Sequence, residues 1–198
     1  MEGGTRAATG ASMRFPAALA LAFALSTAST ANGQPAAPRD GLSLGVGLTV
    51  GSLLADCRDC GDALSGGVQL HAGWMVRPYL AIVGEEWLMA RSDGFVTIYQ
   101  NLATAGARVW ATRRLWLQGG LGLATAGYRS EGFFDQPEEL TAHRPGFMIG
   151  AGFEAIQRPV FALSLELRYG TGFYSQEIGD EHVVGGHSVG LGATAEWY

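Results

Sequence analysis

The chain contains no lysine, so all 13 of its basic residues are arginine. Charged residues make up only 16% of the chain, and the formal net charge is −5. Arginines form no basic stripe, which argues against nucleic-acid binding. The longest uncharged apolar run, Phe15 to Leu25, is shorter than the roughly 20 residues that a membrane helix needs. We therefore expect no α-helical membrane span in the mature protein.

The N-terminal region is typical of a targeting segment. Met13-Arg14 supplies a short positive start, the apolar run follows, and Ser29-Thr30-Ala31 fits the small-x-small cleavage rule. We predict a signal peptide over residues 1–31 that is cut after Ala31, with Gly33 as the second choice. The twelve residues before Met13 do not resemble a signal sequence, so we expect translation to start at Met13. Residues 32–40 form a Pro/Ala linker.

Cysteine is scarce, with two residues in the whole chain. Cys57 and Cys60 form a Cys-Arg-Asp-Cys motif that, in an exported protein, predicts a disulfide closing a small loop. A thioredoxin-like redox site would need a βαβ context, and a zinc site would need further ligands at suitable spacing. Neither is found, so we expect no metal and no cofactor.

Residues 41–198 show segments of roughly ten residues with alternating hydrophobicity, which is typical of transmembrane β-strands. Short and long connections follow one another strictly. The short ones are Arg77-Pro78, Thr112–Arg114 and Gln157–Pro159, and the long ones centre on Asp56–Gly66, Ala90–Phe95, Arg129–Arg144 and Tyr174–His182. This rhythm predicts an all-β fold, an eight-stranded antiparallel up-and-down transmembrane β-barrel over 41–198. Both termini would be periplasmic.

Alternation also predicts which face is outside. In Leu42–Val50 every even position is aliphatic, and small or polar residues lie between. The interior of an eight-stranded barrel is just wide enough for side chains, so we expect small residues and a few paired charges there. The aliphatic faces would then meet lipid. A soluble lipocalin-like barrel or a secreted β-sandwich would bury them instead.

The predicted interior polar network consists of His71, Arg108, Gln118, Glu154, Glu166, Arg168 and Glu196. One of Glu85 and Glu86 would join it while the other met lipid, unless a β-bulge turned both inward. Two aromatic belts are predicted at the edges of the lipid-facing band. They consist of Trp74, Phe161 and Trp197 near the short turns, and Phe147 and Tyr169 near the loops.

Four features together resemble a known family. The signal peptide, the segment Leu42–Val50, the run Arg114–Ala124 (RLWLQGGLGLA) and the aromatic terminus Glu196-Trp197-Tyr198 are similar to the small outer-membrane β-barrel proteins of the OmpA/OmpX type. The resemblance covers residues 41–198 and implies a Gram-negative outer membrane with its lipid and lipopolysaccharide. It also implies recognition by the barrel-insertion machinery. The apolar set ending in Trp197 is one residue out of phase with that family's terminal aromatic residue.

The interior set is expected to be a network of salt bridges and hydrogen bonds, because buried charges need partners. The alternative is a narrow channel, which would prefer cations because carboxylates outnumber arginines in the set. The predicted loops are acidic, which suggests divalent cations bridging to lipopolysaccharide. Phe133 and Phe134, in the longest loop, could contact a surface partner.

An enzyme that modifies lipid A is the remaining alternative. Its candidate residues are His187 and Ser188, with Glu181 or His182 as the orienting group. However, His187 and Ser188 are adjacent, so on a regular strand they would point to opposite faces. We therefore expect no catalytic site. The expected role is structural, or one of surface interaction through the loops.

Overall fold

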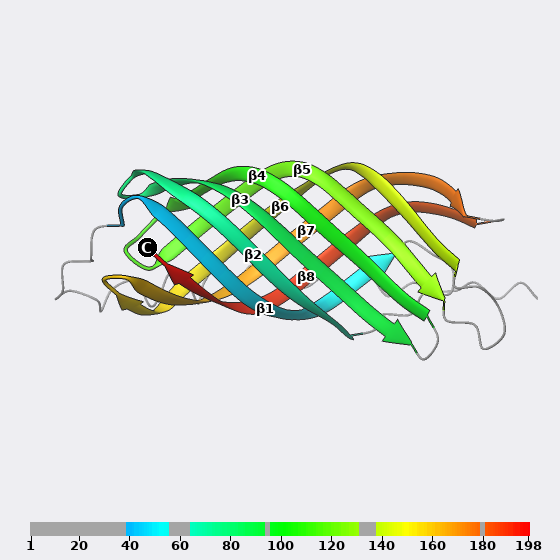
Figure 1. The fold of residues 1–198 in the computed structure, drawn as a ribbon, viewed down its shortest axis with the longest axis horizontal. Helices are drawn as coiled ribbons and strands as arrows, with labels where there is room; N and C mark the ends of the chain where they lie inside the picture. The colour runs from blue at the N-terminus through cyan, green and yellow to red at the C-terminus, as the bar shows by residue number, and fades with distance from the viewer. Residues whose placement is uncertain (1–38, 56–63, 94–95, 131–137, 179–180) are drawn as a thin grey trace, which may run out of the picture. The chain divides into compact units, whose positions relative to one another are not determined.

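A computed structural model describes residues 39–55, 64–93, 96–130, 138–178 and 181–198. They form one closed barrel in which each strand pairs antiparallel with the next and β8 pairs with β1, as Figure 1 shows. The strands are β1 (Leu42–Ala55), β2 (Leu64–Arg77), β3 (Leu80–Asp93), β4 (Val96–Trp110), β5 (Leu115–Ser130), β6 (Glu138–Arg158), β7 (Phe161–Ile178) and β8 (Glu181–Trp197). The predicted eight-stranded antiparallel barrel is confirmed. None of the described residues belongs to a helix that is long and apolar enough to cross a membrane.

The pairing register fixes the slant of the strands and the width of the barrel. A line of paired residues that leaves β3 at Leu80 passes through every strand and returns to β3 at Ala90. A stagger of ten residues over eight strands gives a tilt of about 40° and a backbone radius of about 8 Å. Each residue therefore advances about 2.5 Å along the barrel axis. Such a lumen has room for side chains and little else.

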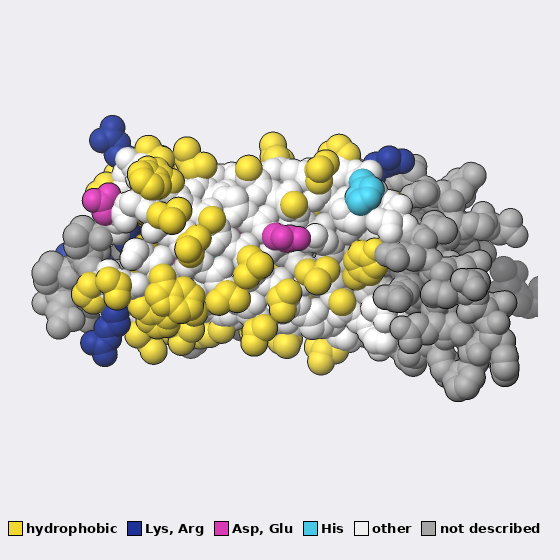
Figure 2. Space-filling model, viewed as in Figure 1, with side chains coloured by type: hydrophobic (Ala, Val, Ile, Leu, Met, Phe, Trp, Pro, Cys, Tyr) yellow, Lys and Arg dark blue, Asp and Glu magenta, His cyan; other side chains and the backbone are white. Residues whose placement is uncertain are grey.

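Alternation of faces places the aliphatic side chains on the outside of the barrel, as predicted. On β1, Leu48 is 69% exposed, whereas the neighbouring Thr49 is 3% exposed. The same alternation runs along β2, where Trp74 is exposed and Gln69 and His71 are buried. Figure 2 shows the result as a flank rich in apolar side chains. The outer wall is thus apolar and the inner wall largely polar.

The long connections contain more strand than predicted. Of the stretch 129–144, residues 129–130 belong to β5 and residues 138–144 to β6, and only two residues, 179–180, separate β7 from β8. Between β3 and β4 the gap is likewise two residues, 94–95. The expectation of loops over these whole stretches is therefore wrong. Backbone pairing continues where the apolar alternation has ended, because ladder hydrogen bonds do not need an apolar face.

The third strand runs without a bulge at its pair of glutamates. Glu85 is 5% exposed and points into the lumen, whereas Glu86 lies on the outer face. The register shifts lie elsewhere, between Met75 and Arg77, between Glu154 and Ile156, and between Gly172 and Ser175. A charged side chain consequently remains on the outer wall.

Candidate functional site

The structure places all seven residues of the predicted interior network inside the barrel. His71, Arg108, Gln118, Glu154, Glu166, Arg168 and Glu196 are each no more than 7% exposed. Glu85 joins them, and so do other polar side chains outside the predicted set, among them Gln69, Gln100 and Ser188, with Ser43 and Thr49 contributed by β1. The lumen is therefore lined by a dense set of polar groups from all eight strands.

Arg168 on β7 is the centre of one group of ion pairs. It donates from Nε to Oε1 of Glu166 at 2.9 Å and from Nη2 to Oε2 of Glu166, also at 2.9 Å. Two parallel bonds of this kind are the strongest arginine–carboxylate geometry. They form because residues two apart on a strand share a face. Arg168 also donates from Nη1 to Glu85 on β3, across the lumen.

Arg108 on β4 is the centre of a second group. Its Nη1 donates to Oε2 of Glu196 at 2.8 Å, and its Nε donates to Oε1 of Gln118 at 2.7 Å. Nε2 of His71 lies 3.2 Å from the same Glu196 carboxylate. Gln118 donates its amide to Glu85, so it joins the two groups into a single network.

Arg39 forms a third contact at the short-turn end, and the sequence had not indicated it. Its Nη2 donates to Oε2 of Glu154 at 2.8 Å and to the carbonyl of Arg113 at 2.7 Å. Its guanidinium lies 4.6 Å from the ring centre of Trp110, whose Nε1 donates to the same Glu154 at 2.7 Å. Arg39 had been assigned to the linker 32–40, because a short non-periodic segment carries no signal of where its side chains point.

Tyr198 adds a further donor at this end, just beyond β8. Burial raises the pKa of its hydroxyl above the usual range, and the nearby Glu196 and Glu154 carboxylates act in the same direction. The hydroxyl therefore stays protonated and donates to Glu154 at 3.4 Å. The short-turn end of the lumen is closed by side chains that meet at Glu154.

Two apolar clusters fill much of the remaining lumen. The larger side chains of one are Trp87, Met89, Leu102 and Met148, and those of the other are Met75, Val83, Trp110 and Trp116. The expectation that small residues and paired charges alone fill the interior is therefore incomplete. An inward-facing position can hold a large apolar side chain where an adjacent position has no side chain, because this leaves room for it.

Glycine supplies that space at two positions. A Cβ on Gly152 would lie 2.2 Å from the ring of Trp116, and a Cβ on Gly170 would lie 2.3 Å from Leu102. The guanidinium of Arg108 stacks 4.3 Å from the ring centre of Trp116, so the charged network and the apolar cluster touch. Large rings and glycines thus fit together across neighbouring strands.

The charges of the lumen are nearly balanced. Four carboxylates, Glu85, Glu154, Glu166 and Glu196, face three arginines, Arg39, Arg108 and Arg168. The contribution of Arg39 reduces the acidic excess that the sequence had suggested. Among the described residues, carboxylates therefore exceed arginines in the lumen by one.

The predicted belt residues lie on the outer wall in two groups, one near the short turns and one further towards the loop side. Phe161 and Trp197 pack with their ring centres 5.5 Å apart, and Trp74 is 59% exposed. Near the loop side, Phe147 packs 6.0 Å from both Tyr169 and Phe173. The register places these two groups about 20 Å apart along the barrel axis.

The candidate nucleophile and base of an enzyme point to opposite walls. Ser188 is fully buried in the lumen, where its hydroxyl donates to Gln100. His187 lies on the outer wall, with Nδ1 2.8 Å from the hydroxyl of Tyr169. The two residues therefore make no His–Ser pair. Among the residues that the structure describes, no His, Cys, Asp and Glu cluster could hold a metal ion.

Several predictions fall outside the described residues. They concern the signal peptide over 1–31 with its start at Met13, the disulfide between Cys57 and Cys60, and the aromatic pair Phe133 and Phe134. These remain predictions from the sequence.

A closed eight-stranded barrel with an apolar outer wall and a polar, filled lumen has the fold of the small transmembrane β-barrels. Among solved structures, it is similar to Ail, the attachment invasion locus protein of Yersinia pestis. That match has 17% identity over 79% of this chain and 99% of that chain, with a TM-score of 0.54. It is also similar to the Neisserial surface protein A, at 14% identity over 80% of this chain and 97% of that one, with a TM-score of 0.55. No protein-family model and no curated protein sequence matches the chain.

Proposed function

We propose that the protein is an integral outer-membrane β-barrel with no transport role, which contributes to the cell envelope through its loop end. The observation that carries this proposal is the contrast between the two walls. Exposed leucines cover the outside, while the lumen holds ion pairs and tryptophan rings. Apolar side chains in such numbers on an outer wall indicate lipid as their surroundings. In this proposal a cleaved signal peptide exports the chain, and the barrel-insertion machinery places it in the membrane.

The filled lumen argues against the channel alternative. The Arg108 and Arg168 groups are linked by Gln118, and the two apolar clusters pack beside them. An ion would have to separate buried pairs that leave unpaired charges behind, which is costly. We expect purified protein in planar bilayers to show no conductance above background. Steady cation-selective openings would contradict this part of the proposal.

The charged residues at the loop end are the side chains best suited to an envelope role. It carries eleven acidic residues, Asp56, Asp59, Asp62, Asp93, Glu131, Asp135, Glu138, Glu139, Glu177, Asp180 and Glu181. Against these stand only four arginines, Arg58, Arg91, Arg129 and Arg144. Five of the acids belong to the ends of the strands: Asp93, Glu138, Glu139, Glu177 and Glu181. Carboxylates and divalent cations are hard partners, so Ca²⁺ or Mg²⁺ would bridge them to the phosphates of lipopolysaccharide.

The acidic loop end of this chain also bears on whether it could bind a polyanion directly. One structure of Ail is a complex with the heparin analogue sucrose octasulfate, which is a polyanion. An acidic loop end would repel a polyanion unless a cation lay between them. We therefore expect binding of lipopolysaccharide that requires a divalent cation.

The test is binding of lipopolysaccharide to the full barrel in lipid nanodiscs, with Ca²⁺ present or removed by EDTA. Replacing Asp135, Glu138 and Glu139 by their amides should weaken the Ca²⁺-dependent binding. The matched control replaces the short-turn arginines Arg113 and Arg158 by glutamine, which should leave binding unchanged. Binding that is equal with and without Ca²⁺ would contradict the role of the acidic loop end.

A further inference from the structure

The outer wall of β3 to β6 carries a polar pair in an otherwise apolar setting. Glu86 on β3 accepts a hydrogen bond from Nδ2 of Asn101 on β4 at 2.8 Å. Its neighbours on the same wall include Leu70 and Leu88, which are 56% and 36% exposed. Glu86 is the sixth residue after Leu80, so it lies about 15 Å along the axis from the short-turn end. In the proposed membrane, this position is inside an apolar band about 25 Å tall.

A carboxylate at that depth in a membrane needs a polar partner. Ionisable side chains within a membrane are rare, and they pair with other polar groups. Among the described residues, Asn101 supplies the one hydrogen bond to the exposed Glu86 carboxylate. Lipid tails cannot supply the missing donors. A protein surface with amide or hydroxyl donors at the same depth can.

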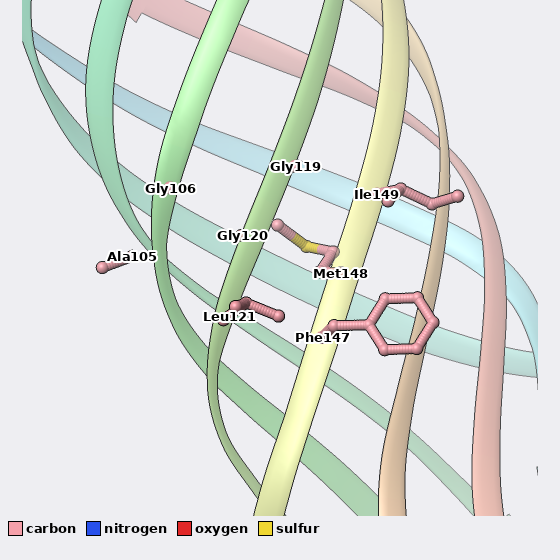
Figure 3. Close-up of a pocket in the computed structure, with 8 residues that line it drawn as sticks. All are labelled: Ala105, Gly106, Gly119, Gly120, Leu121, Phe147, Met148 and Ile149. Atoms are coloured by element: carbon pink, nitrogen blue, oxygen red, sulfur yellow. The ribbon is translucent and has the colours of Figure 1, made fainter.

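A shallow groove lies beside this pair on the same wall. It has a volume of about 420 Å³, and β4, β5 and β6 line it (Figure 3). Its lining residues are Ala105, Gly106, Gly119, Gly120, Leu121, Phe147, Met148 and Ile149. Gly119 has open space where a Cβ would point. By the register, Gly119 and Leu121 lie about 11 and 16 Å along the axis, close to the depth of Glu86.

We propose that this wall is the interface between two copies of the chain, related by a two-fold axis along the membrane normal at β4. Membrane insertion gives both copies the same orientation, so only residues at equal depth can meet. Rotation about β4 brings β3 of one copy opposite β5 of the other. Glu86 and Leu88 of one barrel then face the groove at Gly119 and Leu121 of its partner.

The outer face of β4, which lies on the proposed two-fold axis, allows the two barrels to approach closely. Its outer residues at this depth are Ala103 and Ala105, and small residues let membrane-embedded backbones come together. Asn101 of each copy lies near the axis, where its amide can reach Glu86 of the other copy. The wall is therefore self-complementary, as a two-fold interface requires. The proposal rests on membrane insertion, as proposed above.

Cysteine cross-linking in intact outer membranes tests the interface. In full-length protein with Cys57 and Cys60 replaced by serine, Ala105→Cys lies on the axis. Ala193→Cys, at similar depth on the opposite side of the barrel, is the matched control. Oxidation should give at least about fivefold more dimer from Ala105→Cys than from Ala193→Cys, because a held interface raises the local thiol concentration.

Three further variants identify the groups responsible. Glu86→Leu combined with Asn101→Leu, and separately Gly119→Leu, should reduce the Ala105→Cys dimer to the level of the control. Glu86→Gln, which keeps a hydrogen-bonding side chain, should retain it. Each sample is also run unheated and boiled, which reports insertion independently of dimer formation.

The outcomes separate the two proposals. Equal cross-linking at positions 105 and 193, in protein that shifts on heating, would overturn the interface alone. So would a product at position 105 that contains a different protein, or native mass spectra showing only monomer with bound lipid. Loss of the heat shift in the parent protein would overturn membrane insertion, and the interface with it.

Discussion

Buried charges decide much of the stability of this barrel at the scale of single residues. Arg168 touches two carboxylates, Glu85 and Glu166, and its own side chain is buried. A buried network of this kind stabilises the fold only while every member has its partners. Removing the cation would leave two carboxylates inside a lumen that water enters poorly.

The first prediction therefore concerns Arg168→Met. It should lower the free energy of unfolding by about 3–5 kcal/mol, because it leaves uncompensated buried charges. The matched control is Arg158→Met at an exposed turn, which should change it by less than about 0.5 kcal/mol. Urea titration in lipid vesicles measures both. A loss for Arg168→Met no larger than that for the control would show that the ion pairs contribute nothing.

The second prediction concerns packing against tryptophan. Gly152→Ala places a methyl group where the ring of Trp116 lies, 2.2 Å from the new Cβ. Overpacking of this kind should cost about 1–3 kcal/mol. Gly66→Ala, whose Cβ would have nothing within 4 Å, is the control and should be nearly neutral. Equal stability of the two variants would contradict the described packing of Trp116.

Single residues also show what the sequence could and could not reveal. Alternation assigned Gln118 and Glu196 to the lumen, because the side-chain period of a strand is independent of its neighbours. The same rule could not pair them with Arg108, since pairing depends on register across strands. Arg39 was missed altogether, because no period extends into residues 32–40. Alternation required one of Glu85 and Glu86 to lie on the outer face unless a bulge intervened, and only the regular pairing of β3 shows that it is Glu86.

At the scale of elements, the strands are longer than a crossing of the proposed membrane requires. β6 has 21 residues, which at about 2.5 Å each span about 50 Å along the axis. The apolar band of such barrels is about 25 Å tall. The loop-side ends of β5 to β8 would therefore stand outside the membrane as paired hairpins, and they would carry Glu138, Glu139, Glu177 and Glu181 there.

The third prediction tests where the membrane lies along one strand. On β1, Leu48 and Leu42 are both exposed, at 69% and 53%, but Leu48 is near the middle of the band. Leu48→Arg should cost about 2–4 kcal/mol in lipid vesicles, and Leu42→Arg about 0–1 kcal/mol. Unfolding titrations compare the two. Equal costs would mean that β1 is not crossing lipid at the proposed depth.

The fourth prediction concerns the N-terminal segment that closes the short-turn end. Arg39→Gln removes a charged donor from the buried Glu154 carboxylate, leaving Trp110 and Tyr198 as its described donors. The loss should lower the free energy of unfolding by about 1–3 kcal/mol. Arg77→Gln, at an exposed position, is the control. No difference between the two would show that the contacts of Arg39 do not stabilise the barrel.

At the scale of the whole molecule, the contrast between the outer wall and the lumen is the basis of the proposed membrane location. The lumen combines ion pairs with two apolar clusters, and the outer wall is rich in exposed leucine, valine and isoleucine. Composition alone could not decide which wall faced solvent, since a lipocalin-like barrel would use the same alternation with the faces exchanged. The volume of the lumen distinguishes the two assignments, because charged and glycine-rich faces fit inside a barrel with a backbone radius of about 8 Å and eight aliphatic faces do not.

The most direct test of this account is the electrophoretic mobility in SDS of protein extracted from membranes, unheated against boiled. We predict that the protein is in the outer-membrane fraction and that boiling changes its mobility, because a closed barrel in lipid resists the detergent until it is heated. Protein in the soluble periplasmic fraction, with no change on boiling, would contradict the assignment of the faces. A soluble ligand-binding barrel would then be the better interpretation.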